Sequence, residues 1–318
     1  MMYELTIYNN NNLYYPSVIG NVTWDTERSG SPGTLKFEVY QDGKLDFEEG
    51  NEVRFIDNKD KIFFGYVFTK KRTSDNTIAV TAYDQLRYFK NKDTYSYSKK
   101  STSELLKMLA KDFYLETGDI ENTVYKMSRV EDNTTLFDMM INSMNETLKA
   151  KKKIYVLYDN FGKLNLKNIY NMIVPIMINS SSGESFDYTT SIDSNTYNKV
   201  KLVHEDDNTK KRTVYVDEEI DSINQYGVLL YYETIQDETL VKQKASALLE
   251  LYGSTSKEFS VSNCFGDNRV RAGSGIYVNL AVDNIEFDGL MLVEKVTHTY
   301  SKDSHFMDLK LRGADFNS

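Results

Sequence analysis

A degenerate internal repeat limits what this chain can fold into more than any other feature of its sequence. Each copy has a strand-like segment, a glycine, a second strand-like segment, a second glycine and further apolar alternation. These features are Phe37, Gly50 and Gly65 in the first copy and Phe259, Gly273 and Gly289 in the second. The spacings are 13 and 15 residues in the first copy and 14 and 16 in the second. Glycine at such positions suits a tight turn or a bulge beside a strand.

The matched spacings favour duplication of one small barrel or sandwich. The alternative is that the similarity arises because glycines separate the strands of any antiparallel sheet. Residues 37–68 and 259–292 are therefore expected to superpose, with Gly50 equivalent to Gly273 and Gly65 equivalent to Gly289. A trimer of a duplicated chain would present six similar units around its axis. Such a body can join a three-fold object to a six-fold ring, which an enzyme does not need and a symmetry adaptor does.

Periodicity divides the chain into three parts and predicts an α+β, mainly β, fold. Residues 1–98 and 191–318 show the two-residue alternation of strands, and the last part also has a helical pattern over about 237–252. Residues 99–190 form a smaller α+β part between them. With only 3 prolines and 16 glycines the chain has no low-complexity linker, so the three parts should abut directly.

Local signals place individual elements within these parts. The Ser-Thr-Ser-Glu segment at 101–104 is a capping box, which predicts a helix that starts directly after the first serine. A second helix is expected to begin at residue 133 or 134. The Asp-Gly pair at 42–43 predicts a hairpin turn, after which strand alternation resumes over 45–47.

Charge and composition exclude several functional classes. The chain has 318 residues and a formal net charge of −9, of which −7 falls in residues 191–318. This acidic balance argues against a nucleic-acid or anionic-membrane binder, because affinity for phosphate comes mainly from lysine and arginine. The longest apolar run, residues 172–178, is far shorter than the roughly 20 residues that a membrane-spanning helix needs. A single cysteine, Cys264, excludes an intrachain disulfide and suits a reducing cytosol, and no secretory signal is visible.

No group of residues forms a recognisable reactive site, so the expected catalytic, cofactor-binding and metal residues are none. The histidines are His204, His298 and His305, and the seven-residue spacing of the last two matches no standard metal motif. His298 lies in an alternating segment and is interpreted as a strand-surface residue. Cys264 lacks the orienting groups that a thiol nucleophile needs, and is interpreted as a small residue at a strand end.

Other polar clusters fit ordinary structural roles. The acidic pairs are Glu48-Glu49, Asp206-Asp207 and Glu218-Glu219, each in a predicted turn where solvated carboxylates are common. The Asp-Asn-Lys-Asp segment at 57–60 lacks the spacing of a calcium loop, and the Gly-Ser-Gly segment at 273–275 lacks the third glycine of a dinucleotide site. Met139, Met140 and Met144 are expected to fill a core, and the basic run 149–153 is expected to be a solvated helix end.

Longer strings of residues carry a family resemblance. They occupy residues 135–138, 155–168, 185–193, 195–203, 270–273, 291–298 and 305–309. Together they resemble the XkdQ/YqbQ family of PBSX-like prophages, in order and over nearly the whole chain. The resemblance implies a baseplate hub protein of a contractile phage tail or a phage-tail-like bacteriocin, similar to late control protein D.

The resemblance also implies an assembly. Hubs of this family are homotrimers with two tube-like β-barrel domains, and they join the six-fold tail tube to the three-fold central spike. The expected partners are further copies of this chain, the tail tube protein, the central spike protein and other baseplate proteins, without sequence-specific nucleic acid, cofactor or membrane insertion. Assembly is expected in the bacterial cytoplasm, for a particle whose tail baseplate then contains the protein. The alternatives are a tail-associated peptidoglycan hydrolase and a carbohydrate- or receptor-binding module with exposed tyrosines.

The acidic last part leads to an expectation about the channel of such a hub. A wall that carried many cations would bind the phosphates of passing DNA, whereas an acidic wall repels them. The candidate wall residues are Glu218, Glu219, Asp221, Asp283, Glu286 and Asp288. The alternative is that these carboxylates lie on the outer surface and aid solubility.

Overall fold

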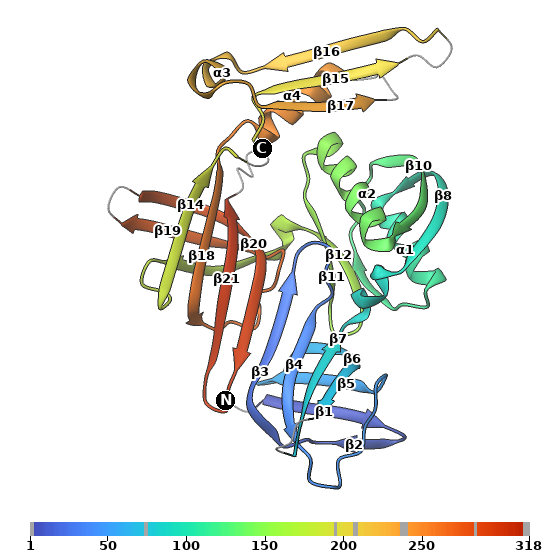
Figure 1. Ribbon diagram of the computed structural model, residues 1–318, viewed down its shortest axis with the longest axis vertical. Helices are drawn as coiled ribbons and strands as arrows, with labels where there is room; N and C mark the ends of the chain where they lie inside the picture. The colour runs from blue at the N-terminus through green and yellow to red at the C-terminus, as the bar shows by residue number, and fades with distance from the viewer. Residues whose placement is uncertain are drawn as a thin grey trace.

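The computed structural model describes residues 3–72, 76–193, 196–205, 209–235, 241–282 and 285–313, the side chains of residues 243, 282 and 285 excepted. Strands supply most of the regular structure, so the fold is α+β and mainly β, as the sequence predicts. Among the described residues, thirteen strands from segments 3–83, 173–191 and 256–313 form one continuous sheet. The molecule is elongated, with the N-terminal strands at one end and a small three-stranded sheet at the other (Figure 1).

The first β unit, residues 3–83, forms one half of the large sheet. Its strands are β1 (Tyr3–Asn9), β2 (Asn12–Tyr14), β3 (Val18–Glu27), β4 (Thr34–Tyr40), β5 (Glu52–Asp57), β6 (Asp60–Arg72) and β7 (Thr77–Tyr83). They pair antiparallel in the order β3-β4-β7-β6-β5-β1-β2. The alternation of apolar and polar residues drives this arrangement, because each strand must bury one face.

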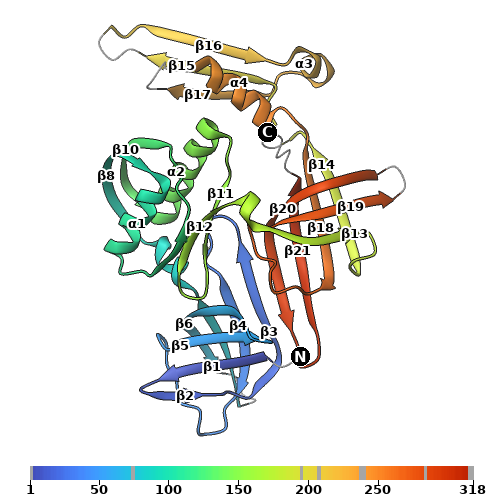
Figure 2. The same cartoon turned by 180° about the vertical axis from the view of Figure 1, so that it is seen from behind.

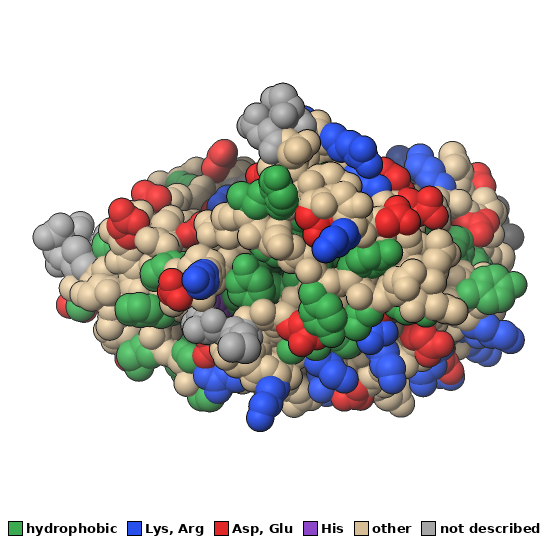
Figure 3. Space-filling view, turned by 90° about the horizontal axis from the view of Figure 1, so that it is seen from below, with side chains coloured by type: hydrophobic (Ala, Val, Ile, Leu, Met, Phe, Trp, Pro, Cys, Tyr) green, Lys and Arg blue, Asp and Glu red, His purple; other side chains and the backbone are tan. Residues whose placement is uncertain are grey.

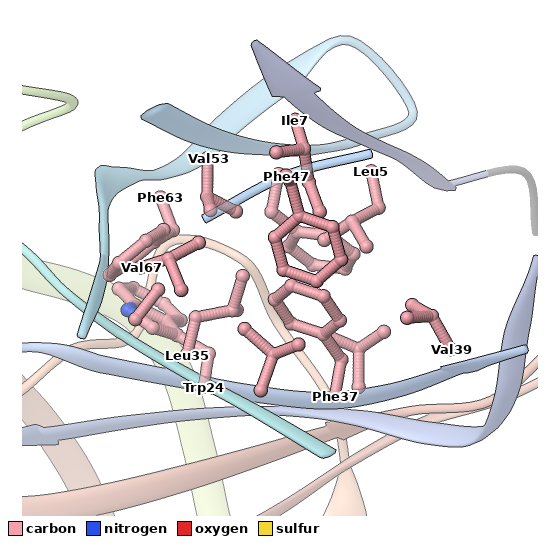
Figure 4. Packing of buried hydrophobic residues seen from close by; sticks show 14 of the residues in the cluster. Leu5, Ile7, Trp24, Leu35, Phe37, Val39, Phe47, Val53, Phe63 and Val67 are labelled. Atoms are coloured by element: carbon pink, nitrogen blue, oxygen red, sulfur yellow. The ribbon is translucent and has the colours of Figure 1, made fainter. Parts of the chain in front are cut away.

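The buried faces of these strands meet in one core (Figure 4). Leu35 and Phe37 of β4 point toward Leu5 and Ile7 of β1 across that core. The hairpin turn predicted at 42–43 is absent: the chain bends there, with Gly43 at a φ of +78°, but no strand follows. The expected strand over 45–47 is a loop. Leu45 and Phe47 nevertheless bury their side chains in the core, which explains the alternation in the sequence.

The second β unit repeats this strand order. Its strands are β13 (Ile173–Asn179), β14 (Ser185–Ser191), β18 (Ser256–Phe265), β19 (Gly275–Val282), β20 (Ile285–Tyr300) and β21 (His305–Gly313). They lie in the order β14-β18-β21-β20-β19-β13, which corresponds to β3-β4-β7-β6-β5-β1. One difference is that β13 is parallel to β19, whereas β1 is antiparallel to β5. Residues 173–190, which periodicity placed in the middle part, thus supply strands to this sheet.

Two glycines occupy the same place in the two units. Gly50 and Gly273 have φ angles of +91° and +92°. The amide of Gly50 donates to the carbonyl of Val67, and the amide of Gly273 donates to the carbonyl of Val293, each over 2.8 Å. Directly after Val67 and Val293, each long strand has a bulge against its neighbour. Shared strand order, glycine geometry and bulge position confirm the predicted duplication.

The second pair of glycines is not equivalent, so that part of the prediction is wrong. Gly65 pairs with Val53, the third residue after the first glycine of its copy. The corresponding position in the second copy pairs with Met291, which is therefore the equivalent of Gly65. Gly289 lies two residues earlier on β20. A two-residue shift keeps every side chain on its own face, so alternation alone could not detect it.

The middle of the chain forms its own α+β layer. Its elements are η1 (Gln85–Lys90), β8 (Lys92–Ser101), α1 (Thr102–Asp112), β9 (Thr117–Ile120), β10 (Lys126–Thr135), α2 (Leu136–Lys151), β11 (Tyr155–Asp159), β12 (Leu164–Asn168) and η2 (Ile169–Met172). The capping box before α1 is present as predicted. Helix α2 begins at Leu136, later than expected, because the side chain of Thr135 caps it by accepting the amide of Asp138.

The last part is an insertion within the hairpin β14–β18, whose strands pair as far as Ser191 and Ser256. Its elements are β15 (Lys199–Glu205), β16 (Arg212–Glu218), α3 (Ile220–Tyr226), β17 (Leu230–Ile235) and α4 (Val241–Tyr252). Helix α4 buries Ala245 and Leu248 against one face of the sheet β16-β15-β17. In the first unit, residues 28–33 alone connect the equivalent strands β3 and β4. Helix α4 confirms the expected helix over 241–252, and residues 237–240 lie outside the described residues.

Candidate functional site: the joint between the β units

One long strand joins the two β units into a single sheet. The first part of β20 pairs with β19, and its last six residues pair with β3, from Lys295 opposite Glu27 to Tyr300 opposite Val22. Strand β21 pairs with the other edge of β20 from Met291 to Tyr300. Figures 1 and 2 show β20 and β3 side by side where the units meet. The duplicated units are therefore fixed to each other by backbone hydrogen bonds.

Two buried histidines pack at this joint. Nε2 of His298 lies 2.9 Å from the carbonyl oxygen of Val270, and Nδ1 lies 2.8 Å from Nε2 of His305. The imidazole of His298 stacks on the ring of Trp24, its partner on β3, with ring centres 5.0 Å apart. Burial lowers the pKa of His298 to about 3 and also lowers the pKa of His305. Both rings are thus uncharged at neutral pH, and the prediction that His298 lies on the surface is wrong, since none of it is exposed.

A turn of the first unit also binds a loop of the second. The amide group of Asn268 donates to Oδ2 of Asp57 at 2.9 Å and to Oδ2 of Asp60 at 3.1 Å. The hydroxyl of Tyr300 donates to the side-chain oxygen of Asn268 at 3.0 Å. The Asp-Asn-Lys-Asp segment, which the sequence marked only as a poor calcium loop, therefore contributes to the contact between the units.

A half-buried arginine lies where both units meet the middle layer. The guanidinium of Arg271 lies 4.3 Å from the ring centre of Tyr158 on β11 and 5.7 Å from the ring centre of Trp24 on β3. Its Nη2 donates to the backbone carbonyl of Asp159 at 2.7 Å. Burial lowers the pKa of this guanidinium, against the opposing effect of Tyr158 and the nearby carboxylates. One side chain thus contacts all three parts of the chain.

Two buried carboxylates accompany this arginine. Asp84 accepts the amides of Gly33 and Leu86, at 2.9 and 3.0 Å. Asp159 accepts the amide of Gly162 at 2.7 Å and the side-chain amide of Gln85 at 3.3 Å. Burial raises the pKa of Asp159 to about 6, and burial with the charge of Asp159 raises the pKa of Asp84 well above its usual value. Perturbed carboxylates can mark catalytic sites, but here both oxygens of each accept hydrogen bonds, three from backbone amides and one from the side chain of Gln85.

The sequence did not single out Arg271, Asp84 or Asp159. Arg271 lies in the Val-Arg-Ala-Gly string at 270–273 that carries part of the family resemblance. Asp84 occupies the N-cap of η1, where aspartate is favoured, so its capping role was visible in principle. Their meeting depends on contacts between residues more than 70 positions apart, which no local pattern reports.

The basic run at the end of α2 is solvated in part, as expected, because Lys151, Lys152 and Lys153 are exposed, whereas Lys149 is half-buried in a contact. Nζ of Lys149 lies 3.2 Å from a carboxylate oxygen of Glu233 on β17 and 3.4 Å from one of Glu146. Burial opposes the charge of Lys149, but the two carboxylates raise its pKa above the usual value. Lys152 pairs with Glu250 of α4. These ion pairs hold the inserted sheet against the middle layer.

A cleft of about 860 Å³ lies between α2, α4 and the second β unit. Its lining includes Met144, Tyr252, Arg312, Glu286 and Asp288. Neither Asp84 nor Asp159 lines it, so the two buried carboxylates do not face this open space.

The expected wall carboxylates fall in two places. Glu286 and Asp288 lie on β20 beside the cleft. Glu218, Glu219 and Asp221 are exposed on the inserted sheet and its helix α3, and Asp283 lies outside the described residues.

The cysteine, the methionine cluster and the third histidine occupy structural positions. Cys264 is buried near the end of β18, as predicted, and burial raises the pKa of its thiol to about 11. Met139 and Met140 fill a core as expected, whereas Met144 is half-buried at the cleft. His204 lies apart from the other histidines, with Nδ1 3.1 Å from the carbonyl oxygen of Ile235.

The structure also locates the Gly-Ser-Gly segment and two of the three acidic pairs. The Gly-Ser-Gly segment is a turn that leads into β19, as predicted. The pair 48–49 is exposed in a loop, the pair 218–219 ends β16 and caps α3, and the pair 206–207 lies outside the described residues. Within the described ranges no three His, Cys, Asp or Glu side chains could hold a metal ion, and no helix is long and apolar enough to cross a membrane.

Exposed apolar side chains are spread over the surface. Seen from the end where β1 and β2 lie, hydrophobic side chains form separate groups between charged ones (Figure 3). The exposed tyrosines include Tyr15 on the first unit, Tyr114 on the middle layer and Tyr232 on the inserted sheet. Because they are distributed over different parts of the chain, they do not form one aromatic binding surface.

The fold is shared with phage-tail proteins of known structure. The crystal structure of the tail protein from Neisseria meningitidis MC58 matches with a TM-score of 0.70 and 12% sequence identity, over 98% of this chain and 97% of that one. Such a match shows a shared fold. The sequence comparisons go further: the model of the YqbQ-like family matches residues 22–312, and the chain belongs to that family.

Two relatives from Bacillus subtilis (strain 168) show the same relationship. Phage-like element PBSX protein XkdQ is 30% identical over 240 residues, and the match covers 73% of this chain and 72% of XkdQ. Protein YqbQ is 30% identical over 239 residues, with the same coverage. The family resemblance inferred from the residues is therefore confirmed.

Proposed function

We propose that this chain is the baseplate hub of a contractile phage tail or a tail-like particle. In this proposal three copies form a ring of six similar β units, which joins a six-fold tail tube to a three-fold central spike. The observation that carries the proposal is the duplication: two units with one strand order, equivalent glycines and equivalent bulges lie edge to edge in one sheet. Repeating that relation three times gives six positions around an axis.

The domain division belongs to the same proposal. The expected boundaries at residues 98 and 190 are adjusted to the strands: residues 3–83 would contribute one tube-like barrel, residues 173–191 and 256–313 the other, and residues 85–172 the middle layer. Within the described residues the large sheet is an open path that ends at β14 and β2, so barrel closure requires neighbouring copies. The proposed partners are copies of this chain, the tail tube protein, the central spike protein and other baseplate proteins, assembled in the bacterial cytoplasm.

Mass and symmetry test the proposal. Sedimentation should give a species of three times the 36.8 kDa chain mass, and images along its axis should show six similar lobes. A stable monomer or an open filament would contradict the hub.

The proposal assigns no enzymatic activity to the chain. The competing hypothesis, a peptidoglycan hydrolase, predicts clearing zones when the purified chain is run on a gel that contains cell walls. A hub predicts no clearing by the wild type. Clearing by the wild type would favour the hydrolase. Replacing Asp84 and Asp159 one at a time would then test whether these buried carboxylates carry the activity.

The channel expectation is also part of the proposal. Glu286 and Asp288 are the described carboxylates of the second unit proposed to face the channel. In an image reconstruction of the trimer, the wall should carry more carboxylates than lysines and arginines. A net positive wall would contradict this.

A further inference from the structure

The two β units pair with each other through two strand edges inside the chain. The equivalent strand edge in the opposite unit is open in each case. Strand β3 of the first unit pairs with the end of β20 in the second unit. The equivalent of β3 is β14, and the equivalent of β20 is β6. Within the described residues β14 pairs only with β18, and the end of β6 beyond Tyr66 pairs only with β7. The open edges of β14 and of the end of β6 are therefore equivalent to the two edges that pair in the β3–β20 joint.

We propose that β14 of one chain pairs antiparallel with the end of β6 of the next chain, in the register of the β3–β20 joint. The proposal rests on the trimeric hub proposed above and adds the residues that connect its copies. Backbone amides and carbonyls on an open strand edge are well suited to accept another strand. Figures 1 and 2 place β14 and β6 on opposite sides of the molecule, as a head-to-tail ring requires.

The equivalent residues fix the register of this contact. Leu35 of β4 and Phe259 of β18 are equivalent, because each lies opposite the residue that pairs with the equivalent Val67 or Val293, so the repeat's match of Phe37 with Phe259 is also two residues out of register. Trp24 and Tyr188 pair with Leu35 and Phe259 and are therefore equivalent. The bulges after Val67 and Val293 align Thr69 with Lys295 and Arg72 with His298. The resulting pairs between chains are Thr69 with Ser191, Lys70 with Thr190, Lys71 with Thr189 and Arg72 with Tyr188.

The chemistry at the paired positions fits this register. Inside the chain, His298 stacks on Trp24, and between chains Arg72 would meet the half-buried ring of Tyr188 in the same way. A guanidinium on an aromatic face is a favourable contact. The end of β6 is basic over residues 70–72, whereas β14 carries the exposed Asp187 and follows Glu184. The two edges are therefore complementary in both hydrogen bonding and charge.

Cysteine pairs test the register directly in the full chain, with buried Cys264 replaced by serine. Neighbouring pairs in an antiparallel ladder alternate between two geometries, with Cα atoms about 5.5 or 4.5 Å apart. The pairs Lys71→Cys with Thr189→Cys and Lys70→Cys with Thr190→Cys cover both. At least one should give disulfide-linked dimers and trimers under mild oxidation. The slipped pair Lys71→Cys with Thr190→Cys should not, and Asp25→Cys with Thr297→Cys should close within one chain as a positive control.

A second measurement tests the charged contact. Arg72→Glu should weaken trimer association by roughly tenfold or more, as expected for a lost cation–aromatic contact. Lys302→Glu, in the exposed turn between β20 and β21, should leave association unchanged. A trimer that links equally through the slipped pair, or not at all, would overturn this contact and leave the hub standing. A chain that stays monomeric at every soluble concentration would overturn both.

Discussion

Arg271 offers the sharpest test of how the three parts of this chain are held together. Arg271→Met keeps much of the side-chain volume and removes the guanidinium that lies between Tyr158 and Trp24. The hydrogen bond to the carbonyl of Asp159 is lost, and two buried carboxylates lose their nearby positive charge. Removing one member of a buried charge group costs about 3–5 kcal/mol. At roughly 2 °C per kcal/mol for a chain of this length, the melting temperature should fall by about 6–10 °C.

The size of this effect should depend on pH. The pKa of Asp159 is raised to about 6, above its value of about 3.9 in an unfolded chain, so its ionisation costs the folded state stability as pH rises through 6. Without the guanidinium this pKa rises further, which extends the loss to higher pH. The difference between wild type and Arg271→Met should therefore be largest above pH 7 and smaller near pH 5, where Asp159 is protonated in both proteins.

Thermal melts followed by far-ultraviolet circular dichroism at pH 5 and pH 7.5 measure both effects. Arg269→Met, two residues away and exposed, is the matched control and should melt like the wild type at both values. Arg271→Lys should be intermediate, because it keeps the charge and loses the planar stacking. If Arg271→Met melts within 1 °C of wild type, or if its deficit grows as pH falls, the assigned role of the buried charge is refuted.

Three further predictions concern other parts of the joint. Gly273→Ala should destabilise more than Gly50→Ala, since both have positive φ but only the former would place Cβ 2.5 Å from Val156; a chemical unfolding series compares them, and equal midpoints would contradict the packing argument. Lys149→Met should loosen the inserted sheet and raise its rate of proteolytic cleavage several-fold, and an unchanged cleavage pattern would mean that the ion pairs do not hold it. Cys264 should react with maleimide at pH 7.5 only after unfolding, because its thiol is buried and its pKa is about 11; prompt labelling of the folded chain would be inconsistent with that burial.

Local chemistry was readable from the sequence where neighbours in the chain decide the structure. The capping box at 101–104 sets the start of α1 because its side chains and amides are three residues apart. Gly50 and Gly273 were recognised as equivalent because positive φ is costly for other residues, so glycine marks that position in each copy. Alternation also identified most strands of the two β units, since each strand buries one face whichever strand lies beside it, but it did not assign residues 173–190 to the second unit.

The sequence alone determined many of the elements, the duplication and the family, while tertiary structure decided their register and their connections. The equivalence of Gly65 was misplaced by two residues because apolar alternation has a period of two and is unchanged by such a shift. His298 was read as exposed because one strand does not reveal which edge partner covers it, and β3 lies far away in the chain. Arg271 carries a charge that local patterns assign to the surface. Only the meeting of three separate parts of the chain supplies the rings and carbonyl that make its burial possible.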